Sequence, residues 1–153
     1  MSAPDGAPQL TQTDRDGGFV LTGLPAGVYQ VTASQPVSAS SLISASASAA
    51  IAAGERSTVA LELARGGIAL TVQLRAAAGQ QVVVIRGDGT DGDAIAHAVA
   101  DGRLVGMAVA TTGAVRFDAL TPGPYSVCTG SSGIACRSIV VAAPPEHQVL
   151  ALP

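Results

Sequence analysis

The sequence predicts an all-β protein built from two tandem β-sandwich modules. Short segments alternate apolar and polar residues with a period of two, which is typical of strands with one face in a core. Eighteen glycines and nine prolines among the 153 residues separate these segments. One phrase also occurs twice, as LTGLPAGVYQV at 21–31 and as FDALTPGPYSV at 117–127. A repeated strand-turn-strand phrase indicates a repeated structural unit.

The repeated phrase predicts one sandwich corner in each module. Aligning Tyr29 with Tyr125 also aligns Gly27 with Gly123. Phe19 and Leu21 lie on one face of the strand that enters the first corner, proline and glycine make the reversal, and the tyrosine lies on the inner face of the outgoing strand. A buried phenol ring needs a partner for its hydroxyl, so we expect each tyrosine to bond backbone across its turn, as tyrosine corners do.

Four other segments need an assignment. Residues 59–64 and 68–74 alternate strictly and are predicted strands, separated by the tight break ARGG. The alanine-rich stretch 43–53 would suit a helix, but isoleucine and alanine alternate there with serine, which weakens helices, so we predict a strand. The segment 93–102 remains open between a short helix capped by Asp93 and another strand.

The N-terminal half resembles a known family. TDRDGGFVLTGLPAGVYQVTA followed by AAGERSTVALEL is similar to the carboxypeptidase regulatory-like domain, a seven-stranded transthyretin-like (prealbumin-like, Ig-like) β-sandwich. Residues 9–64 fit this pattern closely. Residues 66–153 keep the corner, but TTG replaces the aspartate-rich turn. The resemblance implies modules at 1–65 and 66–153, the first without its first strand and part of its second. Two explanations stay open: the chain is cut from a longer protein, or the missing strand comes from a neighbour, because an open sheet edge is a template for strand addition. We favour the first.

Two cysteines bear on the compartment. Cys128 and Cys136 flank the turn of a predicted hairpin, where a disulfide can form. A disulfide implies an oxidising location, so we expect an extracellular, cell-surface or periplasmic protein. The opening residues MSAPDGAPQL have neither a basic nor an apolar region of a signal peptide, and we expect no membrane span.

Candidate ligand sites are few. Asp88, Asp91 and Asp93 are weak calcium candidates, and Asp14 and Asp16 are weaker ones, because aspartate in such Gly-rich segments more commonly forms turns. Residues 86–88 spell Arg-Gly-Asp, an integrin-binding tripeptide that arises readily by chance. We predict no bound metal and no cofactor.

The sequence offers few candidate catalytic residues. Nothing pairs His97 or His147 with a nucleophile or a fixed carboxylate. An intradiol dioxygenase would need both tyrosines on one iron, whereas Tyr29 and Tyr125 belong to separate corners. Lysine and asparagine are absent, so a Lys–Asn isopeptide bond cannot form.

These observations predict a non-catalytic spacer, stalk or binding module of a larger secreted or surface protein of bacteria. A net charge of −3 does not indicate a surface that binds nucleic acid. One alternative is a self-assembling filament subunit that completes its first module with a strand from the next copy. Another is a carbohydrate-binding module, disfavoured because the chain has no tryptophan. The expected partners are other domains of a larger protein or copies of this chain.

Overall fold

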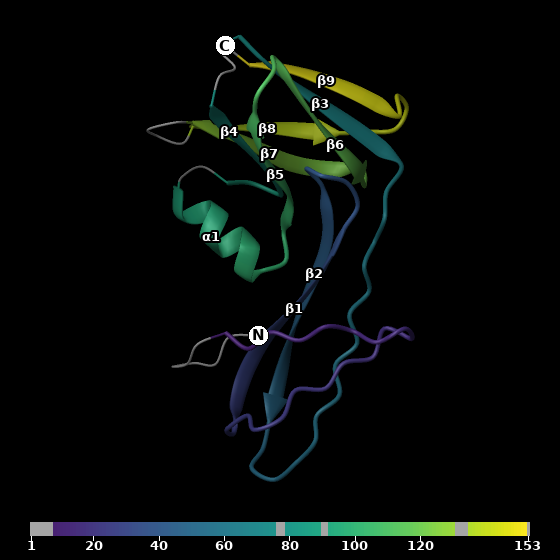
Figure 1. Cartoon of the computed structure of the whole chain (residues 1–153), viewed down its shortest axis with the longest axis vertical. Coiled ribbons are helices and arrows are strands. Elements are labelled where there is room, and N and C mark those ends of the chain that lie inside the picture. The colour runs from purple at the N-terminus through teal and green to yellow at the C-terminus, as the bar shows by residue number, and fades with distance from the viewer. Residues whose placement is uncertain (1–7, 76–78, 90–91, 131–134, 153) are drawn as a thin grey trace.

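The computed structural model describes residues 8–75, 79–89, 92–130 and 135–152 (Figure 1). Within these ranges strands predominate over helix, and one nine-residue helix occurs, which confirms the all-β class. The elements in chain order are β1 (Gly27–Pro36), β2 (Leu42–Ile51), β3 (Ile68–Leu74), β4 (Gln80–Arg86), α1 (Gly92–Ala100), β5 (Leu104–Ala110), β6 (Ala114–Leu120), β7 (Gly123–Gly130), β8 (Ala135–Val141) and β9 (His147–Leu152).

The C-terminal part, residues 68–152, forms a two-sheet sandwich, called here the C-terminal sandwich. One sheet has the order β6-β3-β9 and the other the order β5-β4-β7-β8. Strand β3 is antiparallel to β6 and parallel to β9. Side chains from both sheets share one apolar core that includes Leu70, Val84, Phe117 and Tyr125. The alternating pattern of residues 68–74 therefore does form a strand, at the centre of the smaller sheet.

Helix α1 settles the open assignment of residues 93–102 in favour of a helix. It covers the outer face of the four-stranded sheet (Figure 1). Ala98 packs there in a second apolar cluster with Val83 and Ile85, while Val82 and Val84 face the core between the sheets. The run of apolar residues in β4 follows from this arrangement, because a strand that is covered on both faces has no polar side.

The two corners have the same hydrogen bond. The Tyr29 hydroxyl donates to the carbonyl of Pro25 at 2.6 Å, and the Tyr125 hydroxyl donates to the carbonyl of Thr121 at 2.8 Å. Both rings are buried, with exposed fractions of 1% and 0%. In each case the acceptor lies four residues before the tyrosine, so the bond closes the chain reversal that leads into β1 or β7.

The N-terminal region, residues 8–67, is less complete than expected. Its only assigned sheet within the described residues is the antiparallel hairpin of β1 and β2. The predicted strand at 59–64 is not formed, and neither is the predicted incoming strand around Phe19 and Leu21. The connection into β3 is also longer than the ARGG break, because no regular element occurs between Ile51 and Ile68.

Residues 19–24 and 59–64 have the sequence pattern of strands but lack a hydrogen-bonded neighbour. The exposure of 59–64 alternates, with Val59, Leu61 and Leu63 half-buried. In the C-terminal sandwich both β6 and β9 pair only with β3, and the N-terminal region has no described strand in that position. An extended segment without a hydrogen-bonded neighbour is not assigned as a strand.

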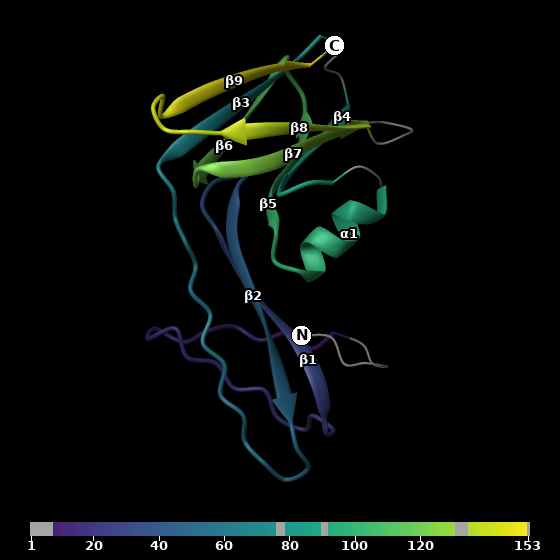
Figure 2. The same cartoon turned by 180° about the vertical axis from the view of Figure 1, so that it is seen from behind.

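The hairpin projects from the C-terminal sandwich, and residues 52–67 run beside it up to β3 (Figure 2). The near end of the hairpin, at the β1–β2 turn, meets the edge strand β5, where Ser41 bridges Gly106. Within the described ranges, no helix has the length and apolar character for a membrane crossing.

Candidate functional site

The acidic loop does not form a metal site in the described part of the chain. Asp88 is exposed, and its carboxylate accepts a long hydrogen bond of 3.5 Å from Ser138. Asp91 and the side chain of Asp93 lie outside the described residues. The described residues hold no cluster of three or more potential metal ligands.

The first acidic turn is organised by its own backbone. Asp14 Oδ1 accepts hydrogen bonds from the amides of Asp16 at 2.9 Å and Gly18 at 2.8 Å. This is the Asx-type turn by which aspartate replaces a backbone acceptor. One of the two carboxylate oxygens of Asp14 is thus bonded within the turn.

The Arg-Gly-Asp tripeptide is built into the sandwich. The Gly87 amide donates to the Pro124 carbonyl, and the Gly87 carbonyl accepts from Ser126 Oγ at 2.8 Å. Arg86 Nε is buried and has no hydrogen-bond partner among the described residues. The tripeptide therefore begins at a packed strand end and is fixed by β7, rather than standing on a free loop tip.

The two histidines are far from each other in the fold. His97 is exposed on α1, and His147 begins β9, where its Nε2 lies 2.9 Å from Thr71 Oγ1. The two tyrosine hydroxyls donate to corner carbonyls. The structure thus brings no pair of the candidate catalytic residues together.

The predicted disulfide between Cys128 and Cys136 is present, with an S–S distance of 2.06 Å. The two residues face each other directly in the β7–β8 ladder. Both belong to the cluster beneath α1, and Cys128 is fully buried. The bridge therefore joins two adjacent strands under a helix, where bulk solvent does not reach Cys128.

The most extensive polar site joins the hairpin to the C-terminal end of α1. This helix ends at Ala100, and Gly102, just beyond its end, has φ 67°. The amides of Gly102 and Arg103 bond back to Val99 and Ala98 in the Schellman pattern. The carbonyls of residues 100–102 then have no partner within the helix, as at any helix C-terminus.

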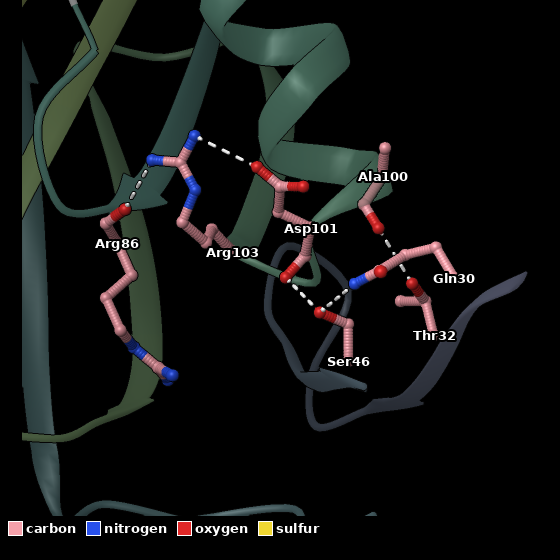
Figure 3. A network of polar contacts seen from close by, with 7 residues as sticks. All are labelled: Gln30, Thr32, Ser46, Arg86, Ala100, Asp101 and Arg103. Atoms are coloured by element: carbon pink, nitrogen blue, oxygen red, sulfur yellow. Dashed lines mark hydrogen bonds and ion pairs between the residues drawn. The ribbon is translucent and has the colours of Figure 1, made fainter. Parts of the chain in front are cut away.

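Three hydroxyls from the hairpin bond these carbonyls, and Figure 3 shows the two from Thr32 and Ser46. Thr32 donates to Ala100 at 2.9 Å, Ser44 to Gly102 at 2.6 Å and Ser46 to Asp101 at 2.6 Å. We call Thr32, Ser44 and Ser46 the hydroxyl cap. It supplies from another part of the chain the donors that the helix end lacks.

The surrounding contacts hold the hydroxyl cap in place. Gln30 Nε2 donates to Ser46 Oγ at 3.0 Å, which orients the serine (Figure 3). Arg103 bonds the Arg86 carbonyl at 3.2 Å and pairs with Asp101 at 3.7 Å. That ion pair is half exposed, so its contribution to stability is small. The hydrogen bonds to the carbonyls are therefore the main contacts that hold the hairpin against the end of α1.

Two glycines allow the hairpin to approach so closely. A Cβ on Gly102 would come within 2.9 Å of the backbone of Ala45. A Cβ on Gly106 would overlap the Ser40 carbonyl and come within 2.7 Å of the Phe117 ring. Side chains at these two positions would push β2 away from β5. The sequence did not predict the role of these glycines or of the hydroxyl cap. The regular serines of 43–53 indicate a row of hydroxyls along one face of the strand, but not what they bond.

We expect Ser44→Ala to lower the free energy of unfolding by about 1–2 kcal/mol, because Ser44 is buried and its hydroxyl lies within hydrogen-bond distance of the carbonyls of both Gly102 and Leu104. Urea denaturation of the variant and the parent protein measures the difference. The matched control is Ser34→Ala on the other strand of the hairpin, where the side chain is exposed and the change should stay within about 0.5 kcal/mol. Equal effects at both positions would contradict the assignment.

The N-terminal region also contains two hollows. One of about 430 Å³ is lined by residues that include Phe19, Leu21 and Leu61. The other, of about 620 Å³, shares Phe19 and Leu21 and reaches Val59. The unpaired segments 19–24 and 59–63 therefore border the same open space.

Comparisons with other proteins identify no relative. No family model matches the chain, and neither curated proteins nor solved structures contain a significant match.

Proposed function

We propose that the chain is a non-catalytic structural module, a spacer or stalk of a larger secreted or surface protein, built from two tandem sandwich units of the carboxypeptidase regulatory-like, transthyretin-like type. The proposed units are residues 1–65 and 66–153. The observation that supports this most strongly is the pair of equal corners at Tyr29 and Tyr125, with the same hydrogen bond to a carbonyl four residues earlier.

The joint between the two proposed units supports a spacer in particular. The hydroxyl cap, the Ser41–Gly106 bridge and the hydrogen bond that the Asp118 amide donates to Ser41 Oγ at 2.8 Å all fix the hairpin on the C-terminal sandwich. A joint with many short polar contacts restricts the angle between its two sides. Such a joint suits a protein that holds other domains at a fixed distance.

The location and the other two functions follow as parts of the proposal. A disulfide under α1 fits an oxidising compartment, so we place the protein outside the cytoplasm. Self-assembly into filaments is the second candidate, because the N-terminal region has unpaired extended segments. Carbohydrate binding has no supporting feature among the described residues, and a glycan panel tests it.

Small-angle X-ray scattering with light scattering tests the spacer function. We expect a monomer of constant shape whose maximum dimension does not change with ionic strength. A variant with Thr32→Val, Ser44→Ala and Ser46→Ala should show a broader distribution of dimensions, while Ser34→Ala should match the parent. Polymers that survive dilution would favour the filament, and a broad distribution in the parent protein would contradict the spacer.

A further inference from the structure

The C-terminal sandwich provides an internal template for the N-terminal region. Strand β7 and strand β1 begin at equivalent glycines and carry the two corner tyrosines, and each forms an antiparallel hairpin with the strand that follows. Residues 19–24 precede β1 as residues 115–120 of β6 precede β7. Residues 59–63 follow β2 as β9 follows β8. The strands on both sides of β3 therefore have counterparts, and β3 itself has none among the described residues.

The pattern of exposure agrees with this correspondence. Phe19, Leu21 and Leu24 are half-buried and alternate with exposed neighbours. Their counterparts Val115, Phe117 and Leu120 occupy the same phase, and the last two are fully buried, with exposed fractions of 0% and 1%. On the other side, Val59, Leu61 and Leu63 have the spacing of the inward residues of β9. The inward side chains are in place but incompletely covered.

The backbone of residues 19–24 already has the shape that pairing requires. In β6, Ala119 has φ 62°, and it lies where the register with β3 shifts between Ile68 and Leu70. Its counterpart Gly23 has φ 72°. A left-handed residue of this kind is typical of a bulge in an antiparallel pair. Segment 19–24 thus carries the bulge conformation without the strand that would oppose it.

The hydrogen-bonding groups of both segments are open. Within the described ranges, the backbones of residues 19–24 and 59–63 make no hydrogen bond to another backbone. Unpaired amides and carbonyls along an extended apolar segment form a template for one more strand. The two hollows lie between these segments and β1–β2, and residues 9–13 also border the first of them, so the space for side chains of an added strand exists.

We propose that the slot between residues 19–24 and 59–63 binds an extended strand of another polypeptide. By the template, this strand runs antiparallel to 19–24 and parallel to 59–63. It carries apolar side chains at alternate positions, as β3 does at residues 68, 70, 72 and 74. One of them lies between Leu21 and Val59, in the place that Leu70 has between Phe117 and Gln148.

The described residues favour a separate polypeptide over a second copy of this chain. A donor strand must release its own backbone pairs, and β3–β9 are all hydrogen-bonded within the C-terminal sandwich. Residues 19–24 and 59–63 of a second copy are unpaired, but they line the hollows of their own chain, so a copy that donated one of them would lose its own slot. Strand β3 has the required pattern, but it is paired on both sides. The binding mode is strand addition, in which backbone bonds supply affinity and alternate side chains supply specificity.

The probe for the test is a synthetic peptide with the sequence of residues 65–75, RGGIALTVQLR, which has an arginine at each end. It is titrated into the isotopically labelled full chain. We expect saturable shifts of the amide resonances of residues 19–24 and 59–63, together with slower hydrogen exchange at those amides. A peptide with Val72→Asp should bind at least about tenfold more weakly, because it places a carboxylate in an apolar hollow.

Matched protein variants locate the binding. Leu21→Asp changes an inward residue and should abolish the shifts, while Val20→Asp changes an outward residue that is 67% exposed and should leave affinity within about twofold. The mapping on the unaltered protein stands even if Leu21→Asp misfolds. Absence of binding, or shifts confined to β5 or β8, would overturn the proposal. Concentration-dependent dimers that protect the same amides would assign the slot to a second copy instead. The spacer function survives an absence of peptide binding, whereas dimers formed through the slot would favour the filament.

Discussion

Replacing Tyr125 with alanine is expected to lower the free energy of unfolding of the C-terminal sandwich by about 3–5 kcal/mol. The ring is fully buried in the core shared by both sheets, so its removal leaves a cavity between them. The hydroxyl also bonds the Thr121 carbonyl at 2.8 Å and lies 3.1 Å from the Thr121 amide. Truncation therefore removes core packing and the closure of the corner together.

Chemical denaturation followed by circular dichroism measures this loss. Tyr125→Phe keeps the ring and removes only the hydroxyl, so its cost should be about 1 kcal/mol. Tyr29→Ala makes the same change in the N-terminal region, where fewer strands surround the ring, and we expect a smaller loss. If alanine and phenylalanine at position 125 cost the same, the packing of the ring would not be what stabilises the corner.

Reduction of the disulfide is expected to lower the free energy of unfolding by about 2–3 kcal/mol. In the chain-entropy model this is the value for a loop of roughly this length, because the crosslink restricts the unfolded chain. Cys128 and Cys136 are eight residues apart and face each other in the ladder, so the native strands remain paired after reduction. The protein should stay folded but unfold at a lower urea concentration.

Urea titrations with and without a phosphine reductant measure this difference. The control is the double variant Cys128→Ala and Cys136→Ala, whose stability should not respond to the reductant. An unchanged midpoint for the parent protein, with the free thiols verified by labelling, would contradict the expected contribution.

The sequence predicted features that depend on local pattern. The corners at Tyr29 and Tyr125, the strand over most of 43–53 and the disulfide hairpin each depend on residues close together in the chain. Residues 59–64 show where that reasoning ends, because their alternation is correct for a strand but pairing depends on a distant segment. A period of two specifies extended backbone and does not specify a neighbour.

The hydroxyl cap was beyond sequence reasoning for the same reason. Serines at every second position of β2 argue against a helix and for a strand, but they do not identify its partners. Ser44 and Ser46 bond the carbonyls of Gly102 and Asp101, which are 58 and 55 positions away. Every residue has a backbone carbonyl, so the sequence does not indicate which carbonyls the hydroxyls bond.

The dependence of α1 on the hairpin has a consequence for how the molecule melts. A helix whose final carbonyls are satisfied by a remote hairpin loses those bonds as soon as the hairpin departs, and its end then frays. The same helix shields Cys128, so fraying would also open a route for reductants to the bridge. The rate of disulfide reduction therefore measures how often the hairpin separates from the C-terminal sandwich.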